Sequence, residues 1–180
     1  MKIFVKWASR EYGLAPRVIT LLLAGALFIF FIPYALISLA PQLDSTFQLP
    51  KVSFGVVNVI LGIILMVVGL FYGLWSNYAE IMRAGGTPVP VIPTQTLLVS
   101  GPFRQCRNPM TFGTICLYLG ISVVVGSISS IVVVCIFGAL LLTYIKLVEE
   151  HELEARFGQA YIVYKAKTPF IIPKPWSRKS

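Results

Sequence analysis

The sequence carries very little charge for its length. Only 12% of its 180 residues are charged, seven residues are acidic, and there is a single histidine. This low charged fraction, with 57% apolar residues and a mean hydropathy of +0.82, excludes an ordinary soluble domain. The three cysteines, Cys106, Cys116 and Cys135, have no metal-ligand spacing and are too few for a disulfide framework. The sequence therefore predicts no metal site.

Other common site patterns are missing as well. His151 is followed by Glu152, but Ala155 stands where a zinc-binding helix needs its second histidine, and Val148 stands where a di-iron helix needs glutamate. No Gly-x-Gly-x-x-Gly turn follows a predicted strand, which excludes a soluble Rossmann-type cofactor domain.

Four apolar stretches dominate the chain: residues 18–40, 54–75, 110–126 and 128–148. A helix needs roughly 20 apolar residues to cross a bilayer, so the first two are comfortable spans and the last two form a tight hairpin of antiparallel neighbours. Because an open sheet would leave unpaired backbone in lipid, we predict an all-α, polytopic membrane helical bundle. We expect about four transmembrane helices, with five as the upper number, and a C-terminal cytoplasmic helical extension.

The expected organisation is one integrated domain with two regions. Residues 1–84 supply the N-terminal membrane helices, and residues 85–180 supply a catalytic region made of a loop, the helical hairpin and the C-terminal extension. Within the loop, the proline-rich residues 85–93 cannot form regular helix and predict a strap across the membrane surface.

Basic residues predict the orientation. All lysines and arginines except Lys51 lie before the first apolar stretch, between the second and third, or at and beyond the end of the fourth. Lys51 lies on the opposite side, together with Asp44. The lysine and arginine bias places both termini and the site in the cytoplasm. Contact with anionic membrane lipids accounts for the net charge of +8, and no nucleic-acid partner is needed.

Two polar segments, residues 101–113 and 149–164, flank the hairpin formed by the last two apolar stretches. Charged residues at the end of membrane spans cost free energy, so we expect those in these segments to take part in chemistry. Asn108 and Pro109 predict a helix start with Asn108 as its cap, and the free amides there, with Arg107, favour an anionic group. Because the hairpin helices are antiparallel, Arg107 is expected to meet Glu149 or Glu150. Gly158 is the expected end of the helix that continues past the fourth span.

These segments resemble the integral-membrane methyltransferases that include isoprenylcysteine carboxyl methyltransferases and phospholipid N-methyltransferases. The resemblance runs through Gly101-Pro102-Phe103, Arg107-Asn108-Pro109, Gly113, Glu149-Glu150, Leu153, Phe157-Gly158, Tyr161, Tyr164 and Pro169. It implies an S-adenosylmethionine site with Arg107 and Glu150 as catalytic residues. The implied cofactor-binding residues are Val99, Ser100, Gly101, Pro102, Arg107, Asn108, Pro109, Gly113, Glu149, Glu150 and Tyr161.

Departures from the family pattern concern the acceptor. Thr111 replaces a usual tyrosine, Asn108 replaces the histidine of the carboxyl branch, and Phe170 replaces a common arginine. Lys167 lies where some relatives have a basic residue. The resemblance therefore implies Thr111, Lys167 and Phe170 as the substrate contacts. We expect a lipophilic substrate that reaches the site from the bilayer, most simply an isoprenylcysteine-like acid that is O-methylated on its carboxyl group.

Three alternatives stay open. The first is N-methylation of a phospholipid or lipid amine, for which Glu150 would be the base. The second is a sterol-type reductase that uses NADPH, and the third is a membrane scaffold without catalysis. If these residues have no role in a site, Gly113, Gly120 and Gly126 only let helices approach closely. Tyr161 and Tyr164 would then be anchors at the membrane interface.

Overall fold

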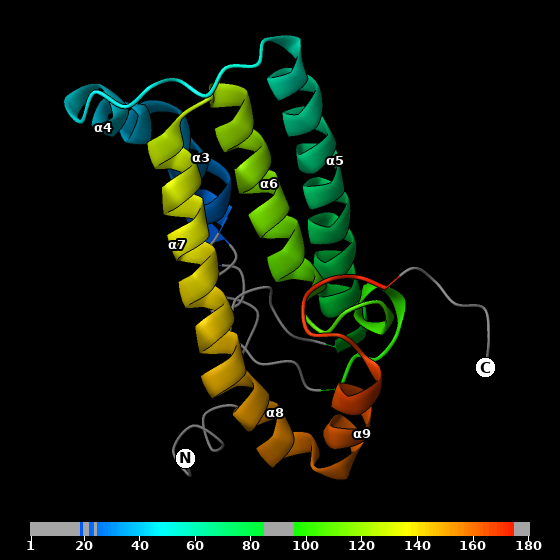
Figure 1. The fold of residues 1–180 in the computed structure, drawn as a ribbon. Coiled ribbons are helices and arrows are strands. Elements are labelled where there is room, and N and C mark those ends of the chain that lie inside the picture. Colours follow the sequence, from blue (N-terminus) through cyan, green and yellow to red (C-terminus); the bar gives the residue numbers. More distant parts are fainter. Residues whose placement is uncertain (1–18, 20–21, 24, 85–95, 175–180) are drawn as a thin grey trace.

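The computed structural model describes residues 19, 22–23, 25–84 and 96–174. The predicted strap at residues 85–93 and the basic tail beyond Lys174 lie outside these residues. All regular structure in the described part is helical, and Figure 1 shows the long helices side by side in a bundle. Three continuous helices, 26–46, 56–82 and 128–157, are long and apolar enough to cross a membrane, and Pro109–Val125 is a shorter apolar helix. The predicted membrane helical bundle is confirmed.

The first long helix joins four segments and contains two prolines. Its parts are η1 (Ala26–Phe31), α3 (Ile32–Tyr34), η2 (Ala35–Leu39) and α4 (Ala40–Thr46), where η1 and η2 are wide π-type turns. In η1 the amide of Ile32 donates to the carbonyl of Leu27, five residues back, and in η2 the amide of Ala40 donates to the carbonyl of Ala35. The next residue in each case is proline, which has no amide hydrogen to continue this pattern.

Side chains of neighbouring helices bond the two carbonyls that the prolines leave without an amide. In the five-residue pattern, Pro33 would donate to the carbonyl of Phe28, which instead accepts from the Tyr118 hydroxyl at 2.8 Å. Pro41 would donate to the carbonyl of Leu36, which instead accepts from the Ser130 hydroxyl at 2.7 Å. A backbone carbonyl in lipid needs such a partner, so these bonds fix the first helix against the hairpin.

The second long helix forms the closest contact of the bundle. It consists of α5 (Val56–Ala79) and the π turn η3 (Glu80–Ala84), and packs along α6 (Pro109–Val125) (Figure 1). The predicted end at residue 75 was wrong, because polar Ser76 and Asn77 stay helical by bonding the carbonyls of Tyr72 and Gly73 on their own helix. Gly62 and Gly69 of α5 face α6 backbone so closely that an added Cβ would lie 2.8 Å and 2.5 Å from it. Small residues at such contacts are typical of membrane helices.

The hairpin turns at the end of the bundle far from the candidate site. Gly126 ends α6 with a φ of +69°, and Ser127 caps α7 (Ile128–Tyr144) by accepting from the amide of Ser130. The Asp44 carboxylate adds a second cap by accepting from the amide of Ser129 at 2.9 Å. A carboxylate at a helix start is favourable, so α4 is fixed to α7 at this end.

The helix of the fourth predicted span continues beyond residue 148, as expected. The helix runs without a break from α7 through η5 (Ile145–Glu149) into α8 (Glu150–Phe157). Gly158 ends α8 as predicted, with a φ of +54°, and α9 (Gln159–Lys167) begins immediately after it. The following residues return toward the start of α6 and the end of α5 (Figure 1).

Candidate functional site

A chain of ion pairs lies where the two polar segments that flank the hairpin meet. The Arg107 Nη1 atom lies 2.8 Å from Glu150 Oε1, and the Lys165 Nζ atom lies 2.8 Å from Glu150 Oε2. Lys165 also lies 2.8 Å from Glu154 Oε1. Glu150 is only 3% exposed, so its pair with Arg107 is buried, whereas the Lys165–Glu154 end of the chain is partly exposed. The predicted meeting of Arg107 with one of the paired glutamates is confirmed, and the partner is Glu150.

The C-terminal segment holds the loop that carries Arg107. The amide of Arg107 donates to the Pro169 carbonyl at 2.9 Å, and the amide of Lys174 donates to the Gln105 carbonyl at 3.0 Å. The Phe170 ring lies over the Arg107 guanidinium, 5.5 Å from ring centroid to Cζ. These contacts orient Arg107 from both its backbone and its side chain.

Asn108 occupies the predicted cap position at the start of α6 but does not act as a cap. Pro109 is the first residue of the helix, as expected, and the Asn108 side chain makes no capping bond. Its amide nitrogen donates instead to the Phe170 carbonyl at 2.8 Å. The prediction of a side-chain cap was wrong because the returning segment offers this side chain an acceptor that the sequence pattern does not reveal.

The short helix η4 (Gly101–Arg104) is fixed by two tyrosines. It begins at Gly101 with a φ of +62°, a backbone conformation that favours glycine. The Tyr164 hydroxyl donates to the Phe103 carbonyl at 2.6 Å, and the Tyr72 hydroxyl donates to Gln105 Oε1 at 2.6 Å. Tyr164 therefore connects α9 to the loop before α6.

Three buried polar atoms of the ion pair lack hydrogen bonds among the described residues. They are Nε and Nη1 of Arg107 and Oε1 of Glu150. Nη1 and Oε1 are close, but the N–H is not aimed at the oxygen, so neither atom is satisfied as donor or acceptor. Buried donors and acceptors normally have partners. A group that offers both an anionic acceptor and a cationic donor would satisfy all three atoms.

Two neighbours of the pair stay protonated. Burial, reinforced by the charge of Glu150, raises the pKa of Tyr161 to about 12, and this tyrosine is almost completely buried. Burial also raises the pKa of the Cys106 thiol to about 11. At neutral pH, Tyr161 can therefore act as a donor but not as a base, and Cys106 is a poor nucleophile.

Gly113 lies away from the ion pair, in the contact between α5 and α6. An added Cβ there would lie 2.6 Å from the Gly73 amide nitrogen and 2.7 Å from the Gly69 carbonyl oxygen. Gly120 makes the same kind of approach to Gly62, with its Cβ position 2.7 Å from that carbonyl oxygen. Close helix packing thus accounts for Gly113.

The remaining predicted residues surround the pair at different depths. Pro102 and Pro109 are buried, Thr111 is half-buried on α6, and Val99, Ser100 and Lys167 are exposed. In the part of the chain that the structure describes, no ion pair joins Lys167 to Glu150, and Thr111 is not a member of the ion-pair chain.

Two residues of this region were missed by sequence reasoning. Lys165 is one, because only the turn at Gly158 brings α9 back against α8. Glu80 is the other: it lies at the end of the second helix, within range of the charge of Glu149. Neither Glu80 nor Glu149 forms an ion pair among the described residues. A glutamate at the end of a predicted span was the available signal for Glu80.

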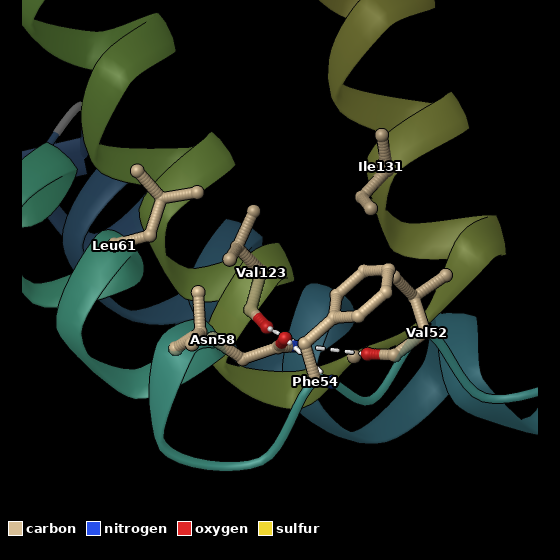
Figure 2. A pocket seen from close by; sticks show the side chains of 8 residues that line it. Val52, Phe54, Asn58, Leu61, Val123 and Ile131 are labelled. Atoms are coloured by element: carbon tan, nitrogen blue, oxygen red, sulfur yellow. Dashed lines mark hydrogen bonds between the residues drawn. The ribbon is translucent and has the colours of Figure 1, made fainter.

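A small apolar pocket lies at the opposite end of the bundle. Its lining includes Val52, Phe54, Leu61 and Ile131, and Figure 2 shows Asn58 at its polar edge. The Asn58 side chain accepts from the Phe54 amide and donates to the carbonyls of Val52 and Val123. Because that amide group is fully bonded, it offers no further polar contact, so this pocket is not the candidate active site.

Comparison with known proteins identifies the family of the chain. Residues 57–160, more than half of the chain, match the family model for phospholipid methyltransferases. This range contains Arg107 and Glu150. No curated protein matches the chain. The chain belongs to the phospholipid methyltransferase family and is a membrane methyltransferase.

Proposed function

We propose that this member of the phospholipid methyltransferase family transfers a methyl group from S-adenosylmethionine to a lipophilic acceptor at the cytoplasmic face of the membrane. The observation that carries the proposal is the set of unsatisfied atoms at the buried pair of Arg107 and Glu150. The methionine part of the cofactor has a carboxylate and an ammonium group on one carbon. This charge pattern matches a guanidinium donor beside a carboxylate acceptor.

The chain's own groups fit this cofactor. Arg107 would hold the carboxylate through Nε and Nη1, and Glu150 would hold the ammonium group through Oε1. Tyr161 adds a protonated hydroxyl close to both charges, and Phe170 covers the guanidinium. When bound, the cofactor supplies an electrophilic methyl group on a sulfonium. The residues then contribute chiefly by orienting the reactants and excluding water, since methyl transfer is an in-line displacement.

The preferred acceptor is a carboxyl group of an isoprenylcysteine-like lipid. Both carboxylate oxygens of Glu150 lie against cations, Arg107 on one and Lys165 on the other, so neither oxygen is open toward the proton of an acceptor. A carboxylate acceptor needs no base, because it is already deprotonated at neutral pH. Thr111, Lys167 and Phe170 remain the proposed contacts of this acceptor, which would reach the site from the bilayer.

A lipid amine is the second candidate acceptor. The family whose model matches the chain is that of the phospholipid methyltransferases. In addition, Glu80 lies within range of the charge of Glu149, and neither carboxylate has an ion pair among the described residues. Carboxylates of this kind suit a cationic amine and could take its proton.

Binding of S-adenosylhomocysteine to the detergent-purified protein tests the cofactor. Calorimetry with NADPH as the control should show binding of S-adenosylhomocysteine alone, and Arg107→Ala and Glu150→Gln should each abolish it while the protein stays folded. Binding of NADPH alone would indicate a reductase, and binding of neither ligand would favour a scaffold.

Methyl transfer in vesicles tests the acceptor. The protein is reconstituted with S-adenosylmethionine labelled in its methyl group, and receives either S-farnesylcysteine or phosphatidylethanolamine. Methylation of the farnesylated acid should give an ester that releases labelled methanol in base. A base-stable label on phosphatidylethanolamine would instead identify the lipid amine as the acceptor.

A further inference from the structure

We propose that Lys165 is a positioning residue that keeps Arg107 available for the carboxylate of the bound cofactor by holding the other oxygen of Glu150. This inference rests on the proposed function and deepens it. It concerns a residue on α9, a helix that packs against the site only because the chain turns at Gly158.

The ion-pair chain alternates in charge along its length. Arg107 and Lys165 bracket Glu150, and Lys165 continues to Glu154. These four charges sum to zero, which suits a ligand part that carries one positive and one negative group. The pKa of Lys165 is raised, first by its hydrogen bond to Glu150 and then by the bond to Glu154, so this lysine stays charged at neutral pH.

Lys165 determines how Glu150 can face Arg107. With Oε2 held at 2.8 Å by Lys165, Glu150 presents only Oε1 to the guanidinium. The contact is close but not hydrogen-bonded, and Nε and Nη1 of Arg107 stay unsatisfied. A carboxylate and a guanidinium otherwise favour a bidentate pair with two parallel hydrogen bonds. Without Lys165, Glu150 would be free to rotate into that arrangement and occupy the donors that the cofactor needs.

The same reasoning predicts a ligand-specific defect. S-adenosylhomocysteine contains the amino-acid part, whereas 5′-methylthioadenosine has the same nucleoside and sulfur without it. Loss of Lys165 should weaken only the first ligand, because only that ligand uses Arg107. A variant that merely loosened α9 would weaken both ligands together, so the ratio of the two affinities separates positioning from general damage.

The test uses calorimetry of both ligands on the full-length protein in detergent. Lys165→Met should weaken S-adenosylhomocysteine binding about tenfold, which corresponds to about 1.4 kcal/mol, and should change 5′-methylthioadenosine binding less than twofold. Lys165→Arg should restore affinity, because it keeps the positive charge. Lys165→Gln, which keeps a donor but no charge, is measured in parallel in case the methionine variant does not fold. Lys146→Met, at an exposed lysine on the preceding helix, is the matched control and should bind both ligands normally.

The outcomes distinguish the two proposals. If the wild-type protein binds no S-adenosylhomocysteine, the proposed function itself fails. If the wild type binds it and both uncharged variants bind it equally well, or lose the two ligands in equal measure, Lys165 does not position Arg107.

Discussion

Replacing Gly113 with alanine should destabilise the bundle without removing a contact to the cofactor. The added Cβ would lie 2.6 Å from the Gly73 nitrogen and 2.7 Å from the Gly69 oxygen, both of them backbone atoms. Backbone atoms cannot move aside as a flexible side chain can. The helices α5 and α6 would therefore have to separate by about 0.8 Å to lengthen the 2.6 Å approach to an ordinary contact of 3.4 Å. Overpacking of this kind typically costs about 1–3 kcal/mol.

Gly73 offers a matched control within the same helix contact. A Cβ on Gly73 would meet nothing within 4 Å, although the backbone of Gly73 touches Gly113. Both variants exchange glycine for alanine inside a helix, and so both gain about 1 kcal/mol of helix preference. The difference between Gly113→Ala and Gly73→Ala therefore isolates the packing cost, and Gly113→Ala should melt several degrees lower.

Thermal unfolding of both variants in detergent, with S-adenosylhomocysteine binding measured well below the melting temperature, decides the role of Gly113. The structural reasoning predicts a stability difference and preserved binding in the folded fraction. Equal melting temperatures with binding lost only in Gly113→Ala would refute it and would return Gly113 to the cofactor site.

Three further variants and one labelling experiment test other parts of the structure. Arg107→Ala should abolish S-adenosylhomocysteine binding in a calorimeter and should lower the melting temperature, because it removes a partner of the buried Glu150; normal affinity would remove Arg107 from the site. Asn58→Ala loses three hydrogen bonds far from the site, so unfolding should become easier by about 2 kcal/mol while ligand binding stays normal. Tyr118→Phe leaves the Phe28 carbonyl without its side-chain donor and should cost about 1–3 kcal/mol in thermal unfolding; an unchanged melting temperature would show that another group replaces the hydroxyl. Cys106, buried and with its pKa raised to about 11, should react with iodoacetamide at pH 8 only after unfolding, as mass spectrometry can measure.

Much of the fold could be predicted from the sequence because lipid imposes simple rules. Uninterrupted apolar length located the helices, and the short connection after Gly126 required α6 and α7 to be antiparallel neighbours. The end of α5 was missed for a physical reason. Ser76 and Asn77 look like the start of a loop, but each side chain bonds a carbonyl of its own helix, so its polar group has a partner within the helix.

The site was predictable only where chain connectivity constrained it. The hairpin brings the start of α6 to the end of α7, which was sufficient to pair Arg107 with a glutamate. It could not choose between Glu149 and Glu150, since that choice depends on the helix rotation through the π turn η5. The helix end at Gly158 was predicted, but the return of α9 against α8 after it was not, and so the approach of Lys165 was missed.

The returning C-terminal segment contributes residues that orient and cover the central ion pair. The family match ends at residue 160 and includes Arg107 and Glu150, whereas Lys165 and Phe170, which touch these two residues, lie beyond it. Backbone bonds from Arg107 to Pro169 and from Lys174 to Gln105 hold this segment against the loop before α6. The central ion pair thus lies within the matched region, while the residues that orient and cover it come from the C-terminal segment.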